Sequence, residues 1–172
     1  VIARYDPVAN KIDWLMGTGQ NASHMIAVSA DQKKFYTANI ASDTITAFDF
    51  QNVPPSASRI THIPVGKQPE AIDLSPDGKE VWTGLNADGM AEVVDTATAR
   101  SVAKINIGGR PYRVKFTPDG KSVVCTMIAS KELLVIDAAT RKEVKRMKLD
   151  GVPLGIVFSA DGKTAFITMV EP

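Results

Sequence analysis

Short apolar runs alternate with turn-forming residues along the whole chain. In one representative stretch the runs cover residues 71–74, 81–85, 91–94 and 102–107, and each is rich in valine, isoleucine or other apolar residues. The segments between them carry the turn signals Pro-Asp-Gly, Asn-Ala-Asp-Gly and Asp-Thr-Ala-Thr. No segment sustains a helical period. The pattern therefore predicts an all-β protein of short strands joined by tight turns.

The turn sequences recur at a fixed interval. SPDGK, TPDGK and SADGK begin at Ser75, Thr117 and Ser159, a step of 42 residues, and the prolines at 69, 111 and 153 keep the same step. An earlier copy begins at Ser29, 46 residues before Ser75, so we expect the four additional residues in a longer loop within 50–58, FQNVPPSAS. A period of this length is typical of repeat architectures.

Four antiparallel strands in about 42 residues are the size and content of a β-propeller blade. We predict blades at 18–65, 66–107 and 108–149, with half-blades at 1–17 and 150–172. A blade cannot cover both of its faces alone, so neighbouring blades must stack on it. Trp82, in the second strand of its unit, is therefore expected in the core between blades rather than at a ligand site.

Three arrangements of about four blades are open at this point. The chain closes alone as a four-bladed ring, forms part of a larger ring of seven or eight blades, or pairs with a second copy in an eight-bladed ring. The half-blades are complementary, because the first supplies third and fourth strands and the last supplies first and second strands. The chain begins with Val1 rather than methionine, which favours a processed chain or a fragment, and hence the larger ring.

The repeat resembles the YVTN-type β-propeller repeats of bacterial and archaeal surface proteins. The resemblance rests on the order proline, apolar strand, Ser-Pro-Asp-Gly-Lys, second strand, and Val-Val-Asp-Thr-Ala-Thr, with Tyr36-Thr37-Ala38-Asn39 closest to the name-giving tetrapeptide. It covers nearly the whole chain. It implies a propeller fold and a periplasmic or cell-surface location, but no single function, since one fold hosts many sites.

Composition narrows the function classes only slightly. The 20 basic and 19 acidic residues nearly balance, which gives no reason to expect nucleic-acid binding. The one basic cluster, at 141–148, is expected to be the solvated side of an edge strand and its turn. Cys125 is the single cysteine, so it excludes an intrachain disulfide and a cysteine-cluster metal site, and it is expected to fill core space. No apolar run is long enough for a membrane span, and we expect neither a bound metal nor a cofactor.

Candidate binding residues gather beside the repeated prolines. The loops that enter the first strands should cluster at one mouth of the propeller channel, where ligand sites commonly lie. The residues singled out there are His24, Glu70, Arg110, Tyr112 and Arg113. His24 and Glu70 occupy equivalent positions in successive blades and could act as a general base or a metal-ligand pair, or simply be solvated. Arg110 and Arg113 could hold a carboxylate or phosphate, or serve only loop solubility.

Two function classes fit this inventory. We expect a non-catalytic propeller module that presents its channel-mouth loops to a protein partner or small ligand, with self-association as a further possibility. The alternative is a propeller enzyme or redox subunit, namely a lactone hydrolase or a haem- or quinone-associated dehydrogenase subunit. By this account the Asp-Gly turns face away from the mouth and are only structural.

Overall fold

The computed structural model describes residues 1–50 and 58–170 and is built entirely of strands. Three four-stranded antiparallel sheets have the orders β3-β4-β5-β6, β7-β8-β9-β10 and β11-β12-β13-β14, and two-stranded sheets β1-β2 and β15-β16 flank them. The predicted fold class is confirmed. The position expected for the four additional residues, 50–58, lies almost wholly outside the described residues. No helix that could span a membrane occurs within the described ranges.

The strands of each sheet follow the chain in order. The element bounds are β1 Ile2–Asp6, β2 Lys11–Met16, β3 Ser23–Val28, β4 Lys34–Asn39, β5 Thr44–Phe50, β6 Ser58–Pro64, β7 Pro69–Leu74, β8 Glu80–Leu85, β9 Met90–Asp95, β10 Arg100–Asn106, β11 Pro111–Phe116, β12 Ser122–Met127, β13 Glu132–Asp137, β14 Glu143–Lys148, β15 Val152–Phe158 and β16 Ala165–Val170.

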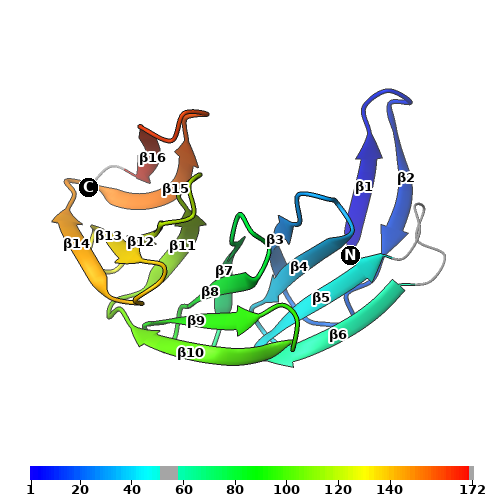
Figure 1. The fold of residues 1–172 in the computed structure, drawn as a ribbon, viewed down its shortest axis with the longest axis horizontal. Helices are drawn as coiled ribbons and strands as arrows, with labels where there is room; N and C mark the ends of the chain where they lie inside the picture. Colours follow the sequence, from blue (N-terminus) through cyan, green and yellow to red (C-terminus); the bar gives the residue numbers. More distant parts are fainter. Residues whose placement is uncertain (51–57, 171–172) are drawn as a thin grey trace.

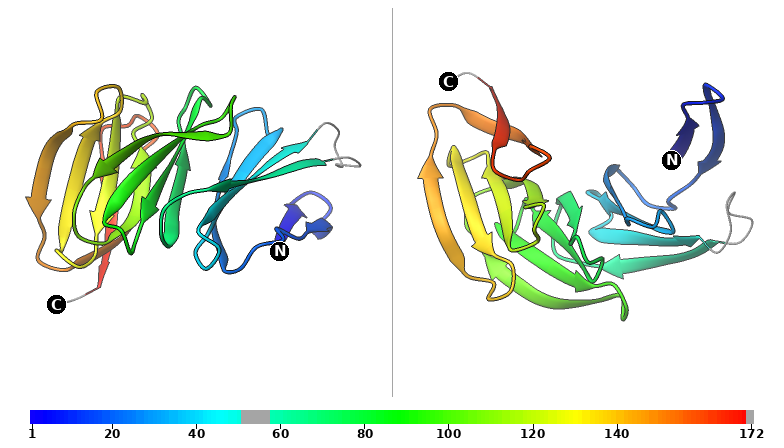
Figure 2. Two further views of the ribbon diagram at one scale, coloured as in Figure 1. Left: turned by 90° about the horizontal axis from the view of Figure 1, so that it is seen from below. Right: turned by 45° about the horizontal axis from the view of Figure 1, so that its top comes forward.

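The sheets stand side by side around an open arc, with the two-stranded sheets at its ends (Figures 1 and 2). The first strands β3, β7, β11 and β15 contact one another in sequence, so they line the inside of the arc. The fourth strands β6, β10 and β14 are the outer edges. Each blade therefore directs the beginning and the end of its first strand to opposite ends of the central hollow.

The core lies between blades, as the repeat predicts. Trp82 of β8 is fully buried, and its ring meets Phe116 of β11 edge-on, with 5.8 Å between centroids. Ala71, Val93 and Val123 belong to the same cluster. Cys125 is also fully buried there, which confirms its expected role in filling core space.

The expectation for the basic cluster is only partly correct. β14 is largely exposed, but Arg141, in the turn before it, packs its guanidinium 5.0 Å from the centre of the Trp82 ring and forms an ion pair with Glu80. Arg146 forms ion pairs with Glu132 and Glu143. Arg141 thus reaches strand β8 of the preceding blade, whereas the ion pairs of Arg146 stay within its own blade, on β13 and β14.

The repeated Asp-Gly turn closes the hairpin between the first and second strands of each blade. In the third copy, Asp119 accepts hydrogen bonds from the Thr117 hydroxyl, at 2.7 Å, and the Lys121 N–H, at 3.1 Å. Gly120 follows with a φ of +71°, which glycine adopts without steric cost. The hydrogen bond from the Ser or Thr hydroxyl to the Asp recurs in all four copies, because each blade needs the same reversal between its first two strands.

We expect the Asp119 turn to weaken in acid. The Thr117 hydroxyl and the Lys121 N–H lower the pKa of Asp119 in the folded protein. A lowered folded pKa adds stability above the unfolded value, near pH 4, and this stability is lost as the pH falls through the folded value. Urea unfolding of the wild type and Asp119→Asn between pH 7 and pH 2.5 tests this. The difference between the two midpoints should shrink in acid, and a constant difference would contradict the prediction.

Candidate functional site

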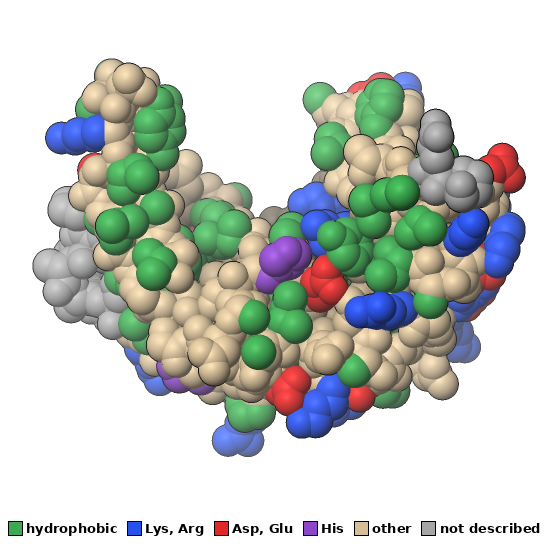
Figure 3. All heavy atoms as spheres, turned by 180° about the vertical axis from the view of Figure 1, so that it is seen from behind, with side chains coloured by type: hydrophobic (Ala, Val, Ile, Leu, Met, Phe, Trp, Pro, Cys, Tyr) green, Lys and Arg blue, Asp and Glu red, His purple; other side chains and the backbone are tan. Residues whose placement is uncertain are grey.

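The predicted site residues lie on or just before the first strands. His24, Glu70 and Tyr112 are the second residues of β3, β7 and β11, so three blades present them at equivalent positions. Arg110 directly precedes β11, and Arg113 is its third residue. All five therefore belong to the same end of the first strands. Figure 3 shows basic, acidic and histidine side chains around the hollow of the arc.

A chain of hydrogen bonds joins Glu70 to Arg110. The side-chain amide of Asn86 donates to the Glu70 carboxylate, and its oxygen accepts from Arg110 Nε at 2.6 Å. Asn86 is buried and follows β8, so it bridges two successive blades. Its backbone N–H is fixed by the Gln68 carbonyl at 2.9 Å. Glu70 thereby orients Arg110 through a buried amide.

Arg113 and Tyr112 form a second unit beside this chain. The Arg113 guanidinium carbon lies 4.2 Å from the centre of the Tyr112 ring, which is cation–π geometry. Its Nη1 donates to the Tyr112 carbonyl at 2.8 Å. The Thr126 hydroxyl accepts from the Arg113 backbone N–H at 3.0 Å. A second cation is therefore held at the rim, near the Arg110 loop.

His24 is exposed, and no hydrogen bond or ion pair joins it to Glu70 in residues 1–50 and 58–170. Glu70 binds Asn86 instead, because that amide lies directly after the second strand of the same blade, which pairs with β7. The described part of the chain also contains no group of three or more His, Cys, Asp or Glu side chains that could hold a metal ion. The geometry therefore supports an anion-binding arrangement more directly than a general base.

Several other rim residues hold the loops in place. Asp43 accepts from the Gln68 backbone N–H at 2.9 Å and pairs with Lys67 at 2.7 Å, and these contacts lower the pKa of its carboxyl. Buried Asn39 donates to Thr46 at 2.8 Å and accepts from Ser23 at 2.7 Å. These polar groups are satisfied within the protein, so they stiffen the mouth rather than offer contacts to a ligand.

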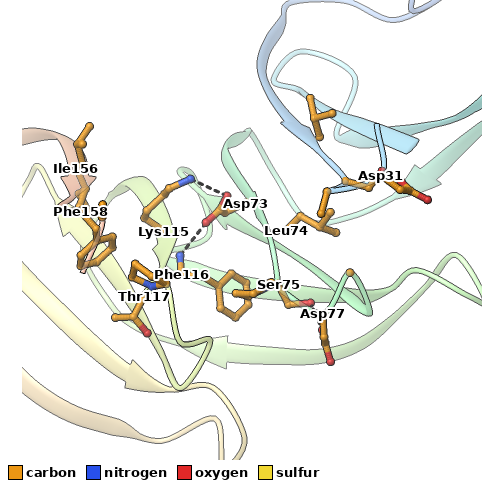
Figure 4. A pocket seen from close by; sticks show the side chains of 18 of the residues that line it. Asp31, Asp73, Leu74, Ser75, Asp77, Lys115, Phe116, Thr117, Ile156 and Phe158 are labelled. Carbon is orange, nitrogen blue, oxygen red and sulfur yellow. Dashed lines mark hydrogen bonds and ion pairs between the residues drawn. The ribbon is translucent and has the colours of Figure 1, made fainter. Parts of the chain in front are cut away.

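A large hollow lies at the other end of the first strands. Its volume is about 890 Å³, and it lies between the last residues of β3, β7, β11 and β15 and the turns that follow them (Figure 4). Leu74, Phe116, Ile156 and Phe158 form its apolar wall, while the Asp-Gly turns supply polar groups. The turns predicted to be only structural therefore also line this end of the channel.

An ion pair spans two blades inside this hollow. Asp73 Oδ1 lies 3.0 Å from Lys115 Nζ, and Oδ2 accepts from the Phe116 backbone N–H at 2.7 Å. Asp73 and Lys115 occupy equivalent positions 42 residues apart. Figure 4 shows their side chains pointing toward one another. The carboxylate satisfies an N–H on the innermost strand β11, which pairs only with β12 among the described strands. It therefore fastens blade β7–β10 to blade β11–β14.

Our sequence reasoning missed this pair because it concentrated on the residues beside the repeated prolines. The signal was available: one column of the repeat reads Ala27, Asp73, Lys115 and Val157, and so places opposite charges in adjacent blades. Aligning the first strands column by column would have indicated the contact.

Comparisons with known proteins bear on the fold. No family model and no curated protein matches the sequence. Among solved structures, hydrazine synthase from Kuenenia stuttgartiensis is similar with a TM-score of 0.81 and 23% identity, over 92% of this chain and 45% of its own. The periplasmic gluconolactonase of Pseudomonas aeruginosa is similar with a TM-score of 0.75 and 16% identity, over 97% of this chain and 56% of its own. This chain thus spans about half the length of either neighbour. Both are β-propellers, and the likeness establishes that the present chain has the β-propeller fold.

Proposed function

We propose that this chain is a non-catalytic β-propeller module whose channel mouth binds an anionic group of a small ligand or a partner protein. The observation that carries the proposal is the chain of hydrogen bonds from Glu70 through Asn86 to Arg110. A buried amide that orients an exposed arginine is an arrangement suited to recognition, because it fixes the guanidinium before the ligand arrives.

The remaining donors of Arg110 suit a carboxylate or phosphate. Its Nε is occupied by Asn86, whereas no hydrogen bond to its Nη1 or Nη2 occurs among the described residues. These two nitrogens form a planar fork that matches two oxygen atoms of an anion. Arg113 supplies a second positive charge and Tyr112 an aromatic surface. His24, at the equivalent position of β3, adds a group that can donate or accept a hydrogen bond.

The proposal extends to family and location. The YVTN-type repeat resemblance supports a role in recognition at the cell surface or in the periplasm. The periplasmic location named for the gluconolactonase neighbour agrees with it. In this view the arc is a segment of a larger ring, in which the mouth is completed by further blades.

Citrate and inorganic phosphate, titrated by calorimetry, are suitable probes of the site. Replacing Arg110 with glutamine should weaken binding of the better probe by roughly ten- to a hundredfold, the worth of a charged hydrogen-bonded contact. Asn86→Ala should weaken it less, by roughly three- to tenfold, because the charge stays but its orientation is lost. Arg100→Gln is the matched control, since Arg100 is an exposed arginine at the start of outer strand β10.

Equal binding by the wild type and Arg110→Gln would reject the anion site. The non-catalytic part of the proposal has its own test, in which the purified protein is assayed with aldonolactones. Turnover that disappears in His24→Ala or Glu70→Ala would favour the lactone hydrolase alternative instead.

A further inference from the structure

Two equivalent loops at the mouth are satisfied in different ways. Residues 66–68 join blade β3–β6 to blade β7–β10, and residues 108–110, one period later, join blade β7–β10 to blade β11–β14. Both loops connect complete blades. The first reads Gly-Lys-Gln and the second Gly-Gly-Arg, so the molecule contains its own reference for the loop that carries Arg110.

Three carboxylates of the protein hold the first loop. Each of the three successive backbone N–H groups of residues 66–68 donates to one of them, namely to Glu92 at 2.8 Å, Asp88 at 2.7 Å and Asp43 at 2.9 Å. The carboxylates crowd the loop so closely that a Cβ at Gly66 would collide with Asp88 Oδ2. A connecting loop at this mouth can therefore bind carboxylate oxygens through its backbone.

None of these carboxylates has a counterpart at the second loop. The equivalent positions carry an apolar residue, a hydroxyl and no side chain at all: Leu134, Ser130 and Gly89. The Gly108 N–H donates to the Asn106 side chain instead, at 3.1 Å. The N–H groups of Gly109 and Arg110 find no acceptor among residues 1–50 and 58–170. All three loop residues are exposed, so a ligand can reach these groups.

The space around the second loop is open, and its charge is not compensated by an ion pair. Apart from its chain neighbours, a Cβ built at Gly108 meets no described atom within 4 Å, in contrast to the crowded Gly66. Lys67 of the first loop forms an ion pair with Asp43 at 2.7 Å, whereas Arg110 forms none within the described ranges. The first loop is thus neutralised by the protein itself, and the second is left cationic.

The two loops also differ in backbone conformation. Gly108 and Gly109 have φ values of +66° and +59°, whereas in the first loop only Gln68, at +54°, lies in the left-handed region. Successive glycines adopt such values without steric cost. The second loop thus takes its shape from its glycines rather than from bound carboxylates, and its N–H groups stay available to a ligand.

We propose that the ligand of the mouth presents a carboxylate to the loop 108–110, where the N–H groups of Gly109 and Arg110 and the Arg110 guanidinium bind it. The ligand takes the part that Asp88 plays for Lys67 in the preceding loop. A carboxylate suits both kinds of donor, since its two oxygens offer about four lone-pair sites to the guanidinium fork and to N–H groups. This contact presupposes the anion site proposed above and places its ligand in the class of carboxylates.

Amide NMR spectroscopy of the whole chain tests the backbone contacts. Succinate titrated into the isotope-labelled protein should shift the amide resonances of Gly109 and Arg110, because a new hydrogen bond changes the environment of each proton. The amides of residues 66–68 are the internal control, since their acceptors lie within the protein. Inorganic phosphate, which like succinate is mainly a dianion near pH 8, should bind roughly threefold or more weakly than succinate.

Filling the loop from within supplies the second readout. Ser130→Asp restores the carboxylate that Asp88 gives to the preceding loop, and it should weaken succinate binding by roughly tenfold or more. Ser130→Asn adds an acceptor without a charge and should weaken binding by roughly two- to fivefold. Ser42→Asp is the matched control, because Ser42 holds the same position in the first blade, where its Oγ accepts from the Asn21 N–H at 2.8 Å. It should leave succinate binding unchanged.

The outcomes distinguish this contact from the proposed function. Succinate binding that does not depend on Arg110 would reject both. Binding that depends on Arg110 but leaves the Gly109 amide unshifted, is unchanged in Ser130→Asn, or is matched by phosphate would overturn the carboxylate contact alone and leave the anion site in place.

Discussion

Replacing Trp82 with alanine should destabilise the protein by about 3–5 kcal/mol, the usual cost of removing a large buried aromatic side chain. Trp82 is fully buried between the blades β7–β10 and β11–β14, in edge contact with Phe116. Its Nε1 also donates to Glu80 at 3.0 Å, and Arg141 covers its ring. The substitution therefore leaves a cavity at the blade interface and removes the surface on which Arg141 packs.

Urea unfolding followed by far-ultraviolet circular dichroism measures this loss without depending on tryptophan fluorescence. Trp82→Phe should recover more than half of the stability, because the aromatic ring stays and only part of the volume and the bond to Glu80 are lost. Val144→Ala, on exposed strand β14, should change the free energy of unfolding by less than about 0.5 kcal/mol. A Trp82→Ala protein as stable as Val144→Ala would show that the blades do not depend on this contact.

Trp82 also illustrates what the sequence predicts well. Its place in the second strand follows from the period of 42 residues, and a repeated strand must be buried on both faces once blades stack. Strand positions and the Asp-Gly hairpins follow from the same local patterns. Such features depend on neighbours in the sequence and on the repeat, so one chain is sufficient to find them.

The contacts of the site were less accessible to this reasoning. The repeat predicts that Glu70 and Arg110 lie at the same end of the first strands, but the connection between them passes through Asn86, in the turn that follows β8. Its role depends on side-chain rotamers across a blade boundary, which no periodicity encodes. The same holds for Arg141, whose guanidinium leaves the solvated face to cover Trp82.

Removing the Asp73 carboxylate should destabilise the protein by about 2–4 kcal/mol in Asp73→Ala. The side chain is mostly buried, and it holds both Lys115 and the backbone N–H of Phe116. Deleting it leaves the buried N–H without an acceptor, which costs about 1–3 kcal/mol, and also removes the charge that Lys115 faces. The loss falls on the boundary between blades β7–β10 and β11–β14.

The two partners of Asp73 can be separated by experiment. Lys115→Met should cost less than Asp73→Ala, about 1 kcal/mol or below, because the Lys115 side chain is 46% exposed and the hydrogen bond from the Phe116 N–H to Asp73 is kept. Asp73→Asn keeps an oxygen that can accept from the Phe116 N–H, so its stability should lie between those of Asp73→Ala and the wild type. Hydrogen exchange of the Phe116 amide reports the backbone contact itself: it should accelerate strongly in Asp73→Ala and little in Lys115→Met. Equal acceleration in both variants would mean that the ion pair, rather than the carboxylate-to-backbone bond, fastens these blades together.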